Sequence, residues 1–117
     1  MSLTVRARQM NGINVVDCVG RLVFGDEALE LRRQAKELLE SNPVLVLNLR
    51  DVNYIDSGGL GVLVGLLTTA RAAGGDLKLA GPAARALEVL AITHLDSVFE
   101  IYPSVERAAE SQRSPAA

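Results

Sequence analysis

The chain has 117 residues, of which 49% are hydrophobic and 22% are charged, and its formal net charge is -2. These values predict one soluble globular domain that can bury a hydrophobic core without disulfides or metals. The slightly negative charge gives no reason to expect nucleic acid or an anionic membrane surface as a partner.

Cysteine usage and hydropathy predict a cytoplasmic protein that is not inserted in a membrane. Cys18 is the only cysteine, so no internal disulfide can form, which fits a reducing compartment. The first residues lack the apolar run of a signal peptide. The most apolar stretch, residues 60–73, is too short to cross a bilayer.

The chain begins with a predicted pair of strands. Polar and apolar residues alternate at 3–8, and residues 13–19 are mostly apolar and branched, ending at Gly20. Asn11-Gly12 between them is a strong signal for a hairpin turn. Cys18 is expected in the second strand as a small apolar residue, since it has no partner thiol.

An amphipathic helix is predicted next. Residues 20–26 form the expected loop, and Asp26 is the expected N-cap of the helix. From Ala28 onward, apolar residues recur with helical spacing and charged residues fill the other positions. Pro43 ends this pattern, because the residue before a proline is disfavoured in a helix.

Residues 53–61 form a polar corner between a predicted strand and a predicted helix. The strand, residues 44–49, is an apolar run of the kind that is buried on both faces of a sheet. The helix is apolar nearly all round, so it is either deeply buried or lends one face to a partner, which leaves a homodimer open. Asp56 and Ser57 carry side chains that cap helix N-termini.

Gly58 and Gly59 allow two interpretations of this corner. In the simpler one the helix is only capped, which is worth about 1 kcal/mol. Capping does not require two glycines, however, and each weakens a helical turn by roughly 0.5–1 kcal/mol. We therefore interpret the glycines as leaving backbone N–H groups open to another molecule, and predict that the corner is the working surface.

Strands and helices alternate in the rest of the chain. The predicted elements are a strand at 76–80, a helix at 83–91, a strand at 98–102 and a helix that starts at Pro103. Together with the first half they predict an α/β fold, with a mixed central β-sheet of about five strands and about four helices packed against it. We expect a single domain at residues 1–110 and a flexible C-terminal tail at 111–117.

The side chains that catalysis or metal binding needs are scarce. Ser57 is not in a nucleophile elbow, because glycine is missing two positions before it. The glycines at 58–61 are not followed by the lysine and hydroxyl residue of a phosphate-binding loop. His94 is the only histidine and has no second imidazole with which to hold a metal. We expect no enzymatic activity, no cofactor and no metal.

The corner resembles the signature of a known family. Residues 54–63 read YIDSGGLGVL, which is similar to the signature of STAS domains and in particular of the bacterial anti-sigma factor antagonists. The resemblance extends to Gly20-Arg21-Leu22, to the strand that ends at Gly81 and to Val98-Phe99. It implies the STAS fold, which agrees with the α/β fold expected from periodicity.

The resemblance also implies a partner and a mode of control. Antagonists of this family bind an anti-sigma factor that is also a serine kinase, and phosphorylation at the helix start breaks the complex. A phosphate adds about -1.5 to -2 charges, which a helix N-terminus tolerates but an interface beside a carboxylate does not. The partner-binding residues implied for this chain are Asp26, Asp56, Ser57, Gly58, Gly59, Leu60 and Gly61.

The sequence departs from the family pattern at the phosphate acceptor. The family motif is Asp-Ser-Ser-Gly or Asp-Ser-Thr-Gly, and its second hydroxyl residue is the acceptor, but Gly58 stands at that position here. Either the usual switch is lost or Ser57 has become the acceptor, and we favour loss. Two other functions known for the family stay open. One is a scaffold in a signalling assembly, and the other is a subunit bound to the ATPase of a lipid transporter.

Overall fold

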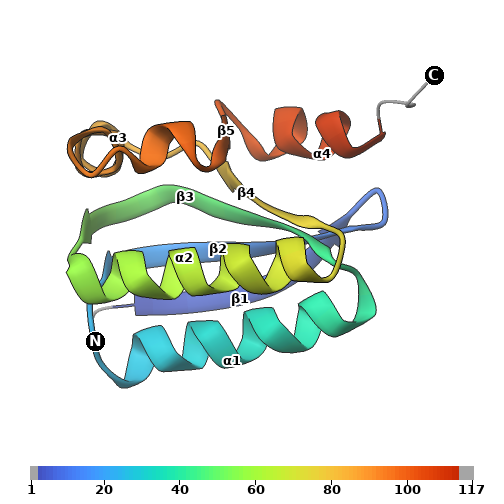
Figure 1. Cartoon of the computed structure of the whole chain (residues 1–117), viewed down its shortest axis with the longest axis horizontal. Coiled ribbons are helices and arrows are strands. Elements are labelled where there is room, and N and C mark those ends of the chain that lie inside the picture. The colour runs from blue at the N-terminus through green and yellow to red at the C-terminus, as the bar shows by residue number, and fades with distance from the viewer. Residues whose placement is uncertain (1–2, 114–117) are drawn as a thin grey trace.

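The computed structural model describes residues 3–113, which form one five-stranded sheet and four α-helices (Figure 1). The strands are β1 (Leu3–Met10), β2 (Ile13–Leu22), β3 (Val44–Ile55), β4 (Asp76–Ala80) and β5 (Glu100–Tyr102). The helices are α1 (Asp26–Ser41), α2 (Ser57–Ala72), α3 (Ala84–Ile92) and α4 (Val105–Arg113), and a short 3-10 helix, η1 (Leu95–Ser97), precedes β5. The predicted α/β fold with a mixed sheet is confirmed.

The strands lie in the sheet in the order of the sequence. β1 and β2 are antiparallel, and each later strand is parallel to the one before it. The predicted hairpin turn is confirmed, since Asn11 and Gly12 both have positive φ angles, 54° and 82°. Asparagine and glycine adopt that conformation at little cost, which is why the pair marks hairpins.

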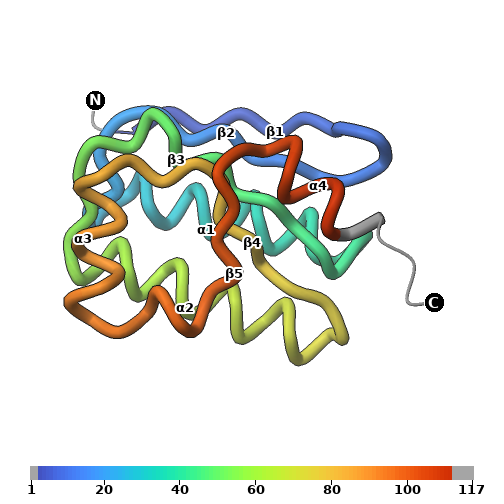
Figure 2. The backbone as a smooth tube through the Cα atoms, turned by 90° about the horizontal axis from the view of Figure 1, so that it is seen from above, coloured from blue at the N-terminus to red at the C-terminus, as the bar shows by residue number. Residues whose placement is uncertain are grey.

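Two hydrophobic cores lie on opposite faces of the sheet. The larger one joins alternate residues of the central strands to α1, α2 and α3; among its fully buried members are Leu31, Leu45, Leu47, Leu63, Leu77 and Leu90. The smaller one lies beneath α4, where Val105 and Ala108 pack on Val15 and Val46. Figure 2 shows α4 beside the β1–β2 hairpin, on the side of the sheet away from α2.

α1 follows the predicted amphipathic pattern, but its N-cap was predicted wrongly. Ala28, Leu31, Ala35 and Leu39 are buried, as the helical spacing indicates. The N-cap residue is Gly25, with a φ angle of 146°, and Asp26 is already the first residue of the helix. Asp26 lies in the first turn instead, a position where the helix dipole favours a carboxylate.

β2 and β3 are longer than predicted, which shortens the loop expected at 20–26 to residues 23–25. Gly20 has a φ angle of 116° and lies next to an irregularity in the pairing of β2 with β3, so it marks a bulge and not the end of a strand. β3 continues through Ile55, which pairs with Leu22. Its second half buries Val52 and Ile55 and exposes the polar residues around them.

The last helix extends past the predicted end of the domain. The predicted boundary at residue 110 falls inside α4, since Ser111 is still helical, and residues 114–117 lie outside the described range.

Cys18 is a buried free cysteine in β2, and burial raises the pKa of its thiol to about 12. In the described residues no helix is both long enough and apolar enough to span a membrane.

Candidate protein-docking site

The polar corner lies where β3 ends beside the end of β2. Asp56 is the N-cap of α2, and its backbone N–H donates to the carbonyl of Leu22 at 3.2 Å. The Asp56 carboxylate accepts hydrogen bonds from the backbone N–H of Gly59, at 2.8 Å, and of Phe24, at 3.1 and 3.2 Å. One side chain therefore fastens the loop before α1 to the first turn of α2.

These hydrogen bonds also fix the charge of the corner. The bond from the Gly59 N–H, followed by the bond from Phe24, holds the pKa of Asp56 below its ordinary value. Asp56 is thus an anion at neutral pH, and the anion is satisfied by the helix start and the loop together. The predicted capping role of Asp56 is confirmed, whereas Ser57 is the first residue of α2 and caps nothing.

The two glycines are explained by contacts inside the chain. A Cβ atom on Gly59 would lie 2.2 Å from the carbonyl oxygen of Leu22, and one on Gly58 would lie 2.5 Å from the Cβ of Phe24. Gly59 is buried and its N–H is bonded to Asp56. The interpretation that this pair of glycines leaves N–H groups bare for another molecule was therefore wrong for Gly59. Close packing of β2 and the loop against α2 requires glycine there.

The implied partner-binding residues differ in what they can contact. Asp26, Ser57 and Gly61 are exposed, and Asp56 and Gly58 are partly buried. Gly59 and Leu60 are buried beneath them, so these two support the corner and do not offer a surface. The structure does bring the loop before α1 and the start of α2 together, as the family resemblance implies.

Sequence reasoning missed a large hydrophobic residue that is exposed at the corner, Phe24. Phe24 is 76% exposed. Leu29, in α1, is 48% exposed, and Tyr54, near the end of β3, is 40% exposed. The Arg21 guanidinium lies 5.1 Å from the centre of the Tyr54 ring. The available signal was that Phe24 is one of two phenylalanines and stands directly before Gly25 in a predicted loop.

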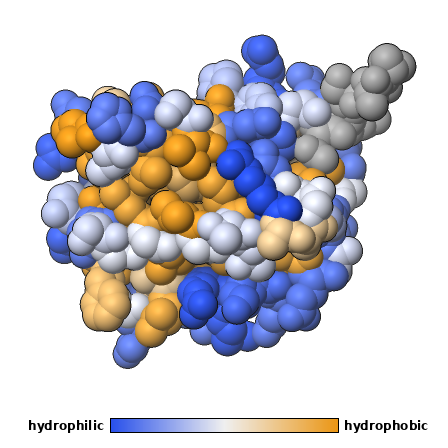
Figure 3. Space-filling model, viewed as in Figure 1, coloured by the Kyte–Doolittle hydropathy of each residue, from blue (hydrophilic) through white to orange (hydrophobic). Residues whose placement is uncertain are grey.

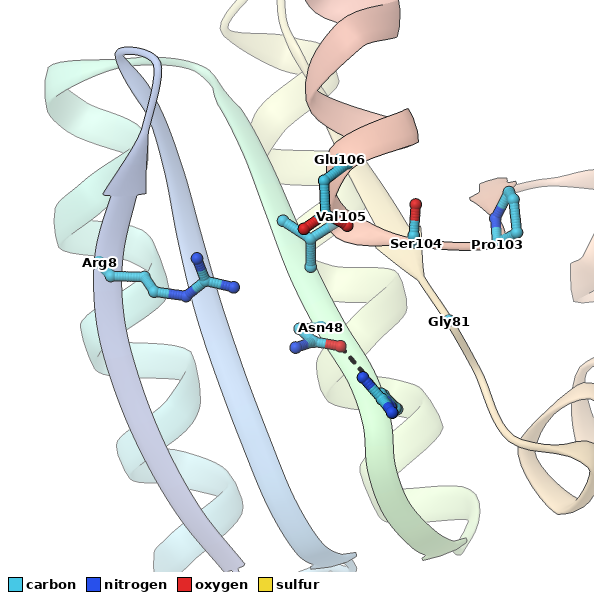
Figure 4. Close-up of a pocket in the computed structure, with 8 residues that line it drawn as sticks. Arg8, Asn48, Gly81, Pro103, Ser104, Val105 and Glu106 are labelled. Atoms are coloured by element: carbon cyan, nitrogen blue, oxygen red, sulfur yellow. Dashed lines mark hydrogen bonds between the residues drawn. The ribbon is translucent and has the colours of Figure 1, made fainter.

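A second polar cluster lies on the sheet face that α4 only partly covers. Asp17 accepts hydrogen bonds from Arg8 at 2.6 Å and from Asn48 at 2.8 Å, and Arg8 holds the pKa of Asp17 below its ordinary value. Arg8 and Asn48 line a hollow of about 260 Å³ that reaches the start of α4 at Val105. Figure 4 shows these side chains on their strands. These side chains satisfy one another, so the cluster ties strands together.

The fold and the corner define the class of protein. The sequence profile of the STAS domain matches residues 4–108, nearly the whole chain. The chain belongs to the STAS domain family, which confirms the family inferred from residues 54–63.

The relatives narrow the class. The anti-sigma-B factor antagonist of Bacillus subtilis is 38% identical over 102 residues, or 86% of this chain and 92% of that protein. A candidate anti-sigma factor antagonist of Thermotoga neapolitana is 41% identical over 66 residues, or 56% of this chain. The chain spans 58% of that relative and 61% of its counterpart in Thermotoga maritima.

A solved structure agrees with these sequence matches. The crystal structure of a candidate anti-sigma factor antagonist from Thermotoga maritima has a TM-score of 0.80 to this chain at 27% identity. The alignment covers 93% of this chain and 94% of that one. The relatives named here are thus all anti-sigma factor antagonists by name, which is the subgroup of STAS domains that the corner resembles.

Proposed function

We propose that the chain is an anti-sigma factor antagonist that binds an anti-sigma factor of the ATPase-kinase type through this corner. The observation that carries the proposal is the Asp56 carboxylate, which holds the loop before α1 against the start of α2. The two segments expose Phe24, Asp26, Ser57 and Gly61. The hydrogen bonds of Asp56 already join their backbones, so little backbone ordering is needed when a partner binds.

The proposed antagonist binds without the usual phosphorylation switch. Gly58 has no hydroxyl group, so the acceptor implied by the family is absent. Ser57 is exposed at the first position of α2, and its hydroxyl makes no hydrogen bond within residues 3–113. A phosphate there would lie beside the Asp56 carboxylate, where like charges repel. We therefore propose a constitutive binder.

Kinase treatment tests the absence of the switch. The chain is incubated with ATP and each purified anti-sigma factor kinase of its source organism, and its intact mass is measured. We expect an unchanged mass. The Ser57→Ala variant is the control that assigns any modification, and one phosphate that is lost in this variant would overturn the constitutive proposal.

Partner binding is tested by calorimetric titration of the same kinases into the chain. Gly61→Gln should weaken binding at least about tenfold, or about 1.4 kcal/mol, because Gly61 is exposed at the corner and a Cβ there meets no atom within 4 Å. Gly65→Gln is a matched control one turn along α2, where a Cβ is equally free. A larger loss at Gly65 than at Gly61 would contradict docking at the corner.

The two other family functions predict different partners in the same experiment. A scaffold would bind other STAS chains and none of the kinases. A transporter subunit would bind a transport ATPase. The relatives' names favour the antagonist over both.

A further inference from the structure

Phe24 is an exposed aromatic side chain on a fixed backbone. Its side chain is 76% exposed, the highest value among the large hydrophobic residues of residues 3–113. Its N–H is nevertheless bonded to both carboxylate oxygens of Asp56. A large aromatic group that is already positioned in the free protein binds a partner with little loss of conformational entropy, which is typical of hot-spot residues.

Phe24 also occupies the space that a side chain at position 58 would need. A Cβ on Gly58 would lie 2.5 Å from the Phe24 Cβ, 3.1 Å from its Cα and 3.2 Å from its Cδ1. The first two atoms belong to the part of Phe24 that rotation of the ring cannot move. Position 58 is the acceptor position implied by the family, so Phe24 lies where the regulated side chain would stand.

The surroundings of Phe24 indicate the chemistry of its partner. Leu29 is 48% exposed in the next helix, and Figure 3 shows hydrophobic side chains at the end of the molecule where α1 and α2 begin. Asp26 and Glu27 place negative charge in the first turn of α1. The complementary surface is an apolar recess with basic side chains at its rim.

We propose that Phe24 and Gly58 are a matched pair, in which Phe24 is the principal contact with the partner and Gly58 stays without a side chain so that Phe24 can hold its place. The inference rests on the proposed function for the identity of the partner, an anti-sigma factor with an apolar, basic-rimmed recess. It also means that a hydroxyl residue at position 58 would displace Phe24 before any phosphate is added.

A double-mutant cycle tests the pairing in the isolated chain. Gly58→Ala is made in the wild-type, Phe24→Ala and Phe24→Gly backgrounds, and Tm is measured. We expect Gly58→Ala to lower Tm by roughly 5 °C in the first two backgrounds, because alanine at position 24 keeps the Cβ that clashes. In the Phe24→Gly background the loss should largely disappear. An equal shift in all three backgrounds would overturn the pairing.

The contact between Phe24 and the partner is tested by measuring binding affinity. Phe24→Ala should weaken binding of the purified anti-sigma factor kinase roughly 30-fold or more. Ile92→Ala is the matched control, since Ile92 is 74% exposed on α3, and its affinity should stay within about threefold. Wild-type affinity in Phe24→Ala would overturn the inference and leave the proposed function standing. If no kinase binds the wild-type chain, the proposed function and the contact role of Phe24 both fail, and the cycle alone decides the pairing.

Discussion

Replacing Gly59 with alanine should destabilise the fold by about 2–3 kcal/mol, the largest stability effect that we expect at the corner. Alanine is the better helix former by roughly 0.5–1 kcal/mol, so propensity alone predicts the opposite sign. The added Cβ would lie 2.2 Å from the Leu22 carbonyl oxygen and 2.9 Å from its carbon. Both are backbone atoms of a strand paired with β3, so they cannot move aside without breaking that pairing.

Chemical denaturation measures this effect, and Gly61→Ala is its control. Gly61 lies two residues further along α2, is exposed, and a Cβ there meets no atom within 4 Å. We expect that variant to gain roughly 0.5–1 kcal/mol. If both variants shift stability equally, the contact between Gly59 and Leu22 is not what selects glycine.

Asp56→Ala should cost about 2 kcal/mol and free the loop that carries Phe24. The substitution removes the N-cap of α2, which alone is worth about 1 kcal/mol. It also removes the acceptor for the Phe24 N–H, a charge-assisted bond that reaches between segments 32 residues apart. We expect denaturation to show the loss, and hydrogen exchange to show faster exchange of the Phe24 amide.

The stability difference between wild type and Asp56→Ala should change with pH in a defined direction. Because the pKa of Asp56 is lowered on folding, its contribution is complete above the ordinary aspartate pKa of about 3.9 and is lost as the pH falls below that value. The stability difference between wild type and Asp56→Ala should therefore shrink on acidification. Asp56→Asn keeps an acceptor oxygen but cannot titrate, so the stability difference between Asp56→Asn and Asp56→Ala should not show this pH dependence. A constant difference between wild type and Asp56→Ala from neutral pH to pH 3 would contradict the role of the anion.

Local signals in the sequence predicted most of the fold and only part of the site. These signals act between residues that are close in the sequence, so they can be recognised without the fold. They are the Asn11-Gly12 turn, the spacing of apolar residues in α1 and the capping side chain of Asp56. The second half of β3 was missed because its buried residues, Val52 and Ile55, are three positions apart with polar residues between them, so this part shows neither a two-residue period nor the apolar run that precedes it.

The reason for the two glycines could not be predicted, because it is a contact across the fold. Gly59 meets Leu22, and Gly58 meets Phe24, over more than 30 positions of sequence. The parallel pairing of β2 with β3 and the hydrogen bonds from Phe24 to Asp56 bring these segments together. Phe24 is exposed, although its hydrophobicity alone would predict burial.

The burial of Cys18 has a practical consequence for following the complex in solution. The protein has no other thiol, and this one stays protonated inside the core, so alkylating dyes have nothing to attack in the native chain. A cysteine introduced at Gly65, one turn along α2 from Gly61, where the backbone also has room, would become the sole labelled position without placing a bulky group on the docking surface. A fluorophore attached there would report the arrival and departure of a partner at the corner in real time.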